Sequence, residues 1–217
     1  MTDPNLESLY HSILKGQLEP AREEVQAALK AGVAPDRILN EGLIAAMGET
    51  GRLFETGEFY VPEMLLAARA MKGCLQLLRP ALVASDVRPT GRVVIGVVAG
   101  DLHDIGKNLV SMMLEGAGFE VRDLGVDVPP PRFVEAVQES QPQIVALSAL
   151  LTTTMAQMGK TLDALQVAGL RGKTKVIVGG APLTEGFATK IGADGYAQDA
   201  SRAVALAMKL VNPPPRS

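Results

Sequence analysis

The chain has 217 residues, of which 47% are hydrophobic and 21% are charged, so it can bury a substantial core and does not have the composition of a disordered chain. Its formal net charge is −3 without a basic cluster, which argues against nucleic-acid binding, and its apolar runs are shorter than the roughly 20 residues that span a membrane. The acidic N-terminus lacks the apolar segment of a secretory signal, and the single cysteine, Cys74, excludes an internal disulfide, so we expect a cytoplasmic protein.

Residues 1–84 carry apolar side chains at helical spacing. The helices expected here lie around residues 6–14, from Pro20 to Gly32, from Pro35 towards Phe54, and from Pro62 onward. Proline is favoured in the first turn of a helix and glycine just beyond its end, which supports these limits. Four helices with short connections predict a small bundle, and bundle packing is the simplest explanation of most of these apolar residues.

The pattern changes after residue 84. Residues 85–90 are rich in turn-forming residues and predict a linker. Short apolar runs then alternate with helical stretches, and the expected strands are residues 92–98, 119–125, 143–150, 175–180 and 195–197. This alternation predicts an α/β domain at residues 91–211, a five-stranded parallel sheet with helices on both faces in the flavodoxin-like order 2-1-3-4-5. Residues 212–217 are expected to form a tail.

Polar residues follow the first and third expected strands, whose carboxyl ends border the crevice where such sheets bind ligands. Asp101 and His103 follow strand one, and Ser148 lies near the end of strand three. A loop histidine is often only a surface residue. A ligating imidazole, however, usually donates its second N–H to a carboxylate or hydroxyl, so we expect an Asp–His–Ser relay.

The scarcity of histidine limits the kind of metal site. The chain has two histidines, which nearly excludes a zinc site built on several of them, and also a phosphohydrolase centre around His103-Asp104. Gly106 would let the backbone approach a bulky ligand, as would Gly179 and Gly180 at the end of strand four. A glycine pair alone is weak evidence, because such pairs often only turn the chain.

Together these motifs resemble the signature of a known family. Asp101-x-His103-x-x-Gly106, then Ser148-x-Leu150 and Gly179-Gly180, are similar to the cobalamin-binding segments of methionine synthase and of the corrinoid proteins of one-carbon methyltransferase systems. The resemblance implies that His103 ligates cobalt in place of the cofactor's own base and that the nucleotide tail enters the α/β domain. It also implies cofactor contacts from four residues in or beside the motifs: Asp104, Ile105, Leu150 and Thr152. Residues 192–197 resemble the family's last tail-pocket segment, which implies further contacts from Tyr196 and Ala197.

The resemblance extends into the helical half. Residues 51–72 are similar to the helical cap that precedes the α/β domain in the methyl-carrying branch of the family. Matched by position, four residues would lie over the upper, methyl-bearing face of the corrin: Phe54, Tyr60, Val61 and Met64. Without the resemblance, the bundle core is the better explanation of these residues.

The resemblance implies a methyl carrier. Such a protein takes a methyl group onto cob(I)alamin at a substrate-specific methyltransferase and gives it up, as methylcobalamin, at an acceptor methyltransferase, with a reductive activase as a further partner. No nucleophile–base pair stands out in the sequence, so we expect no autonomous catalysis. The alternatives are an adenosylcobalamin-dependent mutase small subunit and a cofactor-free flavodoxin-like interaction module. The methyl donor would be chosen by the partner proteins.

Overall fold

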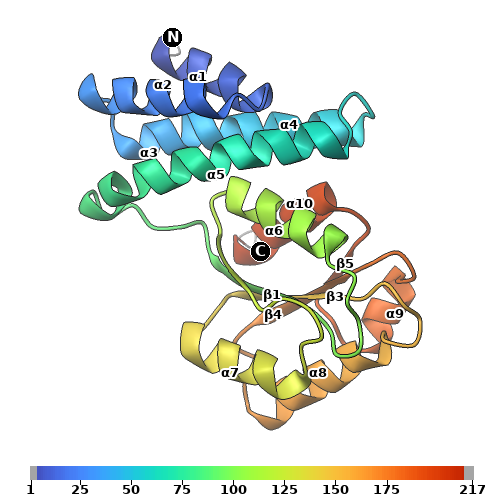
Figure 1. The fold of residues 1–217 in the computed structure, drawn as a ribbon. Coiled ribbons are helices and arrows are strands. Elements are labelled where there is room, and N and C mark those ends of the chain that lie inside the picture. The colour runs from blue at the N-terminus through green and yellow to red at the C-terminus, as the bar shows by residue number, and fades with distance from the viewer. Residues whose placement is uncertain (1–3, 213–217) are drawn as a thin grey trace, which may run out of the picture. The chain divides into compact units, whose positions relative to one another are not determined.

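The computed structural model describes residues 4–212, so the expected tail lies outside the described residues except for Asn212 (Figure 1). The chain forms two compact units whose boundary lies between Pro89 and Thr90. The first unit is helical, and its elements are α1 (Pro4–Leu14), α2 (Leu18–Lys30), α3 (Pro35–Arg37), the π-helix η1 (Ile38–Ile44), α4 (Ala45–Glu55) and α5 (Val61–Ala84). Within residues 4–212, no helix combines the length and apolarity needed to cross a membrane.

The helical unit is held by apolar faces that meet between its helices. Its fully or almost fully buried side chains include Leu6, Leu9, Ile13, Val25, Ile38, Leu43, Met71 and Leu78. α5 begins beside Pro62, as expected from the preference of proline for the first turn, and the Glu63 carboxylate accepts a hydrogen bond from the Tyr60 backbone N–H at 3.0 Å. Pro80 lies inside α5, which continues to Ala84. Burial raises the pKa of the Cys74 thiol in this helix to about 12.

The third expected helix is a continuous rod made of α3, η1 and α4. In η1 the turns are wider than in an α-helix, and at its end the Ala45 N–H donates to the carbonyl five residues earlier, at Asn40. Gly42 is buried in η1, and a Cβ there would lie 2.7 Å from the Leu9 side chain of α1. A larger residue at this position would require the buried Leu9 side chain to shift where α1 packs against the wide turns. The helical periodicity predicted the rod but not its π-helical part.

The second unit is a five-stranded sheet in which every neighbouring pair is parallel, in the order β2-β1-β3-β4-β5, so the predicted topology is confirmed. The strands are β1 (Arg92–Val97), β2 (Glu120–Asp123), β3 (Ile144–Ser148), β4 (Lys175–Gly179) and β5 (Gly195–Ala197). The helices are α6 (Ile105–Gly116), α7 (Pro130–Ser140), α8 (Ala156–Val167), α9 (Glu185–Lys190) and α10 (Ala200–Val211). α6 and α10 cover one face of the sheet, and α7 and α8 cover the other (Figure 1).

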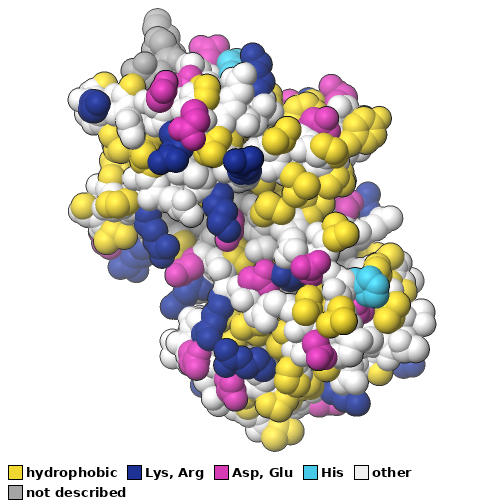
Figure 2. Space-filling view, in the orientation of Figure 1, with side chains coloured by type: hydrophobic (Ala, Val, Ile, Leu, Met, Phe, Trp, Pro, Cys, Tyr) yellow, Lys and Arg dark blue, Asp and Glu magenta, His cyan; other side chains and the backbone are white. Residues whose placement is uncertain are grey.

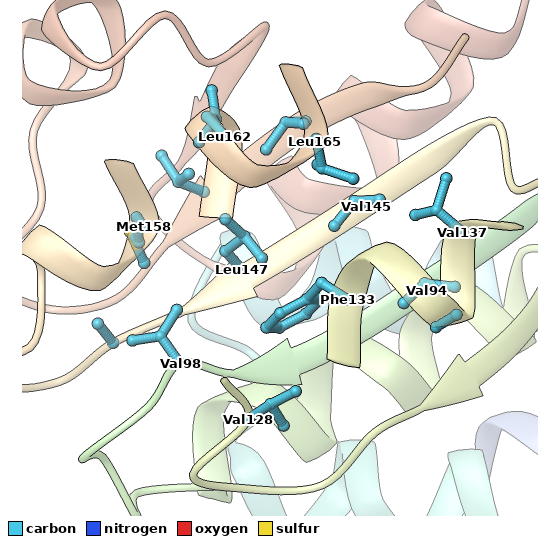
Figure 3. Close-up of a cluster of buried hydrophobic side chains, with 14 of the residues drawn as sticks. Val94, Val98, Val128, Phe133, Val137, Val145, Leu147, Met158, Leu162 and Leu165 are labelled. Carbon is cyan, nitrogen blue, oxygen red and sulfur yellow. The ribbon is translucent and has the colours of Figure 1, made fainter. Parts of the chain in front are cut away.

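A cluster of apolar side chains lies between the sheet and the helices α7 and α8 (Figure 3). Phe133 of α7 is completely buried in it, against β1. A Cβ at Gly96 would lie 2.9 Å from the Phe133 ring, so glycine makes room for the aromatic side chain in the middle of the strand. The three central strands, β1, β3 and β4, are buried on both faces, which explains why they read as continuous apolar runs in the sequence.

The strand register aligns the carboxyl ends of four strands. Val97 is paired with Ser148, Ser148 with Gly179, and Gly179 with Ala197. The loops that follow β1, β3, β4 and β5 therefore begin side by side at one edge of the sheet. The expected site residues of the α/β unit lie on these loops and strand ends.

Candidate functional site

The centre of this edge is the fully buried carboxylate of Asp101 in the loop after β1. Its Oδ2 atom accepts hydrogen bonds from the backbone N–H groups of Leu150, at 2.8 Å, and Leu151, at 3.2 Å, and from the Thr154 hydroxyl at 2.7 Å. Its Oδ1 atom accepts the backbone N–H of His103 at 3.1 Å and lies 2.7 Å from Nδ1 of the same residue. One carboxylate thus joins the loop after β1 to the loop after β3.

These contacts determine which imidazole nitrogen is available. Burial alone raises the pKa of Asp101, but the hydrogen bonds from Thr154, His103 and Leu150 outweigh it and hold the pKa well below its usual range. The carboxylate is therefore ionised at neutral pH and can only accept, so Nδ1 of His103 must be the donor. In the neutral ring this leaves a lone pair on Nε2, to which no residue in the described range 4–212 forms a hydrogen bond. The His103 side chain is 50% exposed.

The hydroxyl that is hydrogen-bonded to Asp101 belongs to Thr154, and a role for Ser148 in a relay stays a prediction. The loop after β3 turns back, with the Thr154 N–H bonded to the Leu151 carbonyl at 3.0 Å, and this turn brings the buried Thr154 onto the carboxylate. In the described part of the chain, no hydrogen bond joins the Ser148 side chain to Asp101. In the sequence, three consecutive threonines follow strand three, and any of them could supply this hydroxyl. Thr154 is buried whereas Thr152 and Thr153 are exposed, and this difference is visible only in the structure.

Apolar side chains stand exposed around this histidine. Ile105 is 80% exposed, and further exposed apolar residues lie in the loops after β1 (Leu102), after β2 (Val126) and after β3 (Leu150 and Leu151). Figure 2 shows hydrophobic side chains exposed on the surface of the α/β unit. A Cβ placed on Gly106 would meet no heavy atom within 4 Å, so open space adjoins the first turn of α6. Asp104 immediately precedes that helix, and its Oδ2 accepts a hydrogen bond from the Asn108 side-chain amide at 2.9 Å.

Gly179 and Gly180 allow the strand ends to approach one another. Gly180 has a φ of 138°, and a Cβ there would overlap the carbonyl of Ala149. A Cβ on Gly179 would lie 3.0 Å from the Ala197 carbonyl oxygen. The pair is therefore required by the backbone itself, whatever binds beside it.

The other expected contacts of the α/β unit differ in accessibility. Thr152 is exposed in the loop after β3. Tyr196 is half-buried against the apolar cluster, and Ala197 is buried in β5. The backbone of these two residues therefore lies at the edge of the sheet, while the tyrosine ring contributes to the core.

In the helical unit, the four expected cap residues fall into two groups. Tyr60 is 67% exposed, and Val61 is exposed beside it at the start of α5. Phe54 is half-buried near the end of α4, and Met64 is completely buried. Tyr60 and Val61 thus present an apolar surface to solvent, whereas Met64 behaves as a core residue.

The chemistry at this edge fits a metal that arrives with ligands of its own. Across residues 4–212, no three His, Cys, Asp or Glu side chains come together in a group that could hold a metal ion. A single oriented imidazole can supply one axial bond. The apolar surface around it and the open space at Gly106 suit a large, flat group with apolar surface. The residues present therefore fit a metal-containing macrocycle.

Two family descriptions cover most of the chain. Residues 91–205 match a B12 binding domain, and residues 6–79 match a second family that is also described as a B12 binding domain. The match at residues 91–205 includes every site residue of the α/β unit discussed above. The match at residues 6–79 includes the four cap residues.

Curated relatives and solved structures match nearly the whole chain. Dimethylamine corrinoid protein 3 of Methanosarcina acetivorans is 42% identical over 210 residues, which are 95% of this chain and 99% of that protein. Trimethylamine corrinoid protein 2 of the same organism is 46% identical over 195 residues, 89% of this chain and 90% of that protein. A cobalamin-binding protein from Desulfitobacterium hafniense aligns with a TM-score of 0.80 and 32% identity, covering 98% of this chain and 100% of its own. The methanol:cobalamin methyltransferase complex of Methanosarcina barkeri gives a TM-score of 0.88 and 30% identity over 97% of this chain and 81% of that one.

Proposed function

This chain belongs to the B12-binding protein family, and from that premise we propose that it is a corrinoid protein that carries a methyl group between two methyltransferases. The observation that carries the proposal is the buried Asp101 carboxylate bonded to Nδ1 of the half-exposed His103. The bound cofactor would supply the cobalt centre that accepts and releases the methyl group. The protein would supply the axial ligand, its orientation and the exclusion of water.

The axial ligand in this proposal is Nε2 of His103, with the cofactor's own base displaced. Asp101 fixes the Nδ1–H tautomer and strengthens the imidazole as a ligand, because an ionised acceptor draws the Nδ1 proton. Thr154 and the two backbone amides keep the carboxylate ionised although it is buried. When the bond between His103 and the metal is released, Asp101 would be the group that favours a proton on the freed imidazole.

The remaining residues of the α/β unit would bind the cofactor through shape. The side chains of Leu102, Ile105 and Leu150 would pack against the corrin and exclude water from the axial bond. Gly106 would leave room for the ring edge. The nucleotide tail would follow the strand ends, where the candidate contacts are Asp104, Ser148, Thr152, Gly179, Gly180, Tyr196 and Ala197.

We propose that the helical unit, residues 1–84, protects the methyl-bearing face, that residues 85–90 are the linker, and that residues 91–211 hold the cofactor. Tyr60 and Val61 are the candidates for this cover because they are exposed apolar residues, and Phe54 joins them in part. Met64 would take part only if the bundle around it repacks, since its side chain is completely buried. A cover of this kind must move before a partner can reach the methyl group.

The proposed partners are a substrate-specific methyltransferase and an acceptor methyltransferase, with a reductive activase that restores the cofactor, all in the cytoplasm. The names of the curated relatives favour a methylated amine as the donor. The near-complete coverage of these relatives favours the carrier over a mutase subunit. If the protein failed to bind cobalamin, the cofactor-free interaction module would be the better explanation.

Electron paramagnetic resonance of the cob(II)alamin complex tests the ligation. Protein grown with nitrogen-15 histidine should show an axial nitrogen coupling that differs from that of unlabelled protein. The coupling should persist in His11→Gln, the matched control at the other histidine, and disappear in His103→Ala. If the coupling is the same with and without the label and in His103→Ala, the cofactor keeps its own base. If the wild type does not bind the cofactor, the proposal of a carrier is rejected.

A further inference from the structure

The loop that carries His103 is held on both sides by one short segment, residues 123–128, here called the brace segment. We propose that the brace segment positions His103, and that Asp127 and Asp123 are its two positioning residues. The inference rests on the proposed function in that it concerns the same histidine. It adds residues that lie outside the three sequence motifs and that follow α6 in the sequence.

Asp127 of the brace segment forms hydrogen bonds with the part of the loop that precedes His103. The Asp127 carboxylate accepts the Gly100 backbone N–H at 2.6 Å, and the Asp127 backbone N–H donates to the Asp101 carbonyl at 3.0 Å. The dipeptide Gly100-Asp101 is thus held at its N–H end and at its carbonyl end. Just before it, Val98 and Val128 form a parallel bridge that brings the two loops together.

The backbone at Asp127 is unusual for a residue with a side chain. Its φ is 53°, in the left-handed region that non-glycine residues seldom adopt. The residue is exposed, so it gains little from burial that could offset this conformation. In this conformation Asp127 forms its hydrogen bonds with Gly100 and Asp101. The strained backbone therefore serves the loop that carries His103.

The brace segment holds the chain after His103 through Asp123. Lys107, in the first turn of α6, is only 3% exposed and forms an ion pair with the Asp123 carboxylate. A buried cation at a helix N-terminus is unfavourable, both because it loses hydration and because the helix dipole opposes it. The other oxygen of Asp123 accepts the Gly125 N–H at 2.8 Å, which fixes the carboxylate on the segment. The pair therefore ties the start of α6 to the brace segment.

Together these contacts leave the loop little freedom at its two ends. Gly100 lies three residues before His103, and Lys107 lies four residues after it. The Asp101 carboxylate holds the imidazole from within the loop. If the ends shift, the Nδ1–H···Oδ1 bond must lengthen or bend, because Asp101 remains bonded to Leu150 and Thr154 of the loop after β3.

Nitrogen-15 histidine spectra of the protein without cofactor test this inference, and they do not depend on whether cobalamin binds. The chain has two histidines, so each spectrum contains His103 and, as an internal reference, the exposed His11 of α1. Near pH 8 the wild type should hold His103 as the Nδ1–H tautomer. Asp127→Gly, which suits the left-handed backbone but removes the carboxylate, should lower the ratio of Nδ1–H to Nε2–H by about fivefold, the factor that one net hydrogen bond corresponds to.

Three further variants separate positioning from general stability. Asp127→Asn keeps an acceptor for Gly100 and should retain the wild-type ratio. Arg122→Gln removes an exposed ion pair with Glu139 beside the brace segment, and it should also leave His103 unchanged. Lys107→Met fills the buried space without a charge and leaves Asp123 partly exposed, so the fold should survive while the tautomer ratio falls as in Asp127→Gly.

The outcomes are distinct from those of the ligation experiment. A His103 signal that stays unchanged in both Asp127→Gly and Lys107→Met, with His11 also unchanged, would overturn the inference even if His103 ligates cobalt. A change in His103 that Arg122→Gln reproduces would also overturn it, since that effect would be one of general loosening. A change confined to Asp127→Gly and Lys107→Met would support positioning, whatever the cofactor does.

Discussion

Thr154→Val removes the one side-chain hydroxyl bonded to the Asp101 carboxylate while keeping the shape of a buried side chain. Thr154 donates to Oδ2 at 2.7 Å, and valine cannot donate at all. A hydrogen bond to a charged group contributes about 1.5–3 kcal/mol to stability. Since Oδ2 keeps the N–H groups of Leu150 and Leu151, we expect the lower end of this range, a loss of about 1.5–2 kcal/mol from the free energy of unfolding of the α/β unit.

The pH dependence gives this prediction a sign. The pKa of Asp101 in the folded protein lies below its usual range, so its ionised form stabilises the fold at neutral pH, and this contribution is lost as the pH falls through the folded pKa. Removing the Thr154 hydroxyl raises that pKa towards its usual value. The difference between wild type and variant should therefore be constant from about pH 6 to 8 and shrink only in acid.

Hydrogen exchange of the β1 and β3 amides in the protein without cofactor measures the stability of the α/β unit separately from that of the helical unit. Thr153→Val, in the same run but at an exposed position, and Ser148→Ala are the matched controls, and each should cost less than about 0.5 kcal/mol. A Thr154→Val variant as stable as the wild type would refute the reasoning. So would a Ser148→Ala variant that loses as much as Thr154→Val.

Four other substitutions test separate features of the α/β unit. Gly180→Ala should destabilise the unit by about 3 kcal/mol or more in thermal unfolding, because the added Cβ would overlap the Ala149 carbonyl and alanine rarely adopts this φ. Gly106→Ala should fold normally and weaken hydroxocobalamin binding. Thr174→Val should raise the free energy of unfolding by about 1 kcal/mol, since the buried Thr174 hydroxyl has no hydrogen-bond partner among residues 4–212; a lower value would show that the hydroxyl is satisfied. Burial raises the pKa of Asp194, but its hydrogen bonds with Val176, Lys175 and Arg171 outweigh burial and lower the pKa overall. Asp194→Asn should therefore lose about 1–2 kcal/mol of unfolding free energy at pH 7, and the loss should shrink as the pH falls through the lowered pKa; an equal loss in acid would contradict this.

The sheet could be predicted because its central strands are buried on both faces. The segments that became β1 and β4 are apolar at almost every position, which distinguishes them from the amphipathic helices between them. Proline and glycine marked several helix ends within one or two residues, as at Pro62 for α5. The wide turns of η1 escaped prediction, because their apolar spacing does not differ visibly from that of an α-helix.

The site was harder to predict than the sheet because its contacts depend on how loops fold back. Asp101 and His103 lie two residues apart, and their pairing could be expected from the sequence. Whether Ser148 or Thr154 reaches Asp101 depends on the turn at Leu151, which no local pattern reveals. The contact between Gly100 and Asp127 spans 27 positions, and the exposure of Asp127 gives no sign that it acts on another loop.

The wide turns of η1 have a consequence for how the sequence can diverge. A π-helical turn takes up one residue more than an α-helical turn, and the rod stays continuous. Deleting one residue within Ile38–Ile44 can therefore close the rod into an α-helix without rotating α4. The same deletion inside α4 would rotate all that follows by roughly 100° and turn the exposed, hydrogen-bonded Glu49–Arg52 pair away from solvent. Single-residue insertions and deletions among relatives should accordingly fall in η1, where the helix can change length without losing its phase.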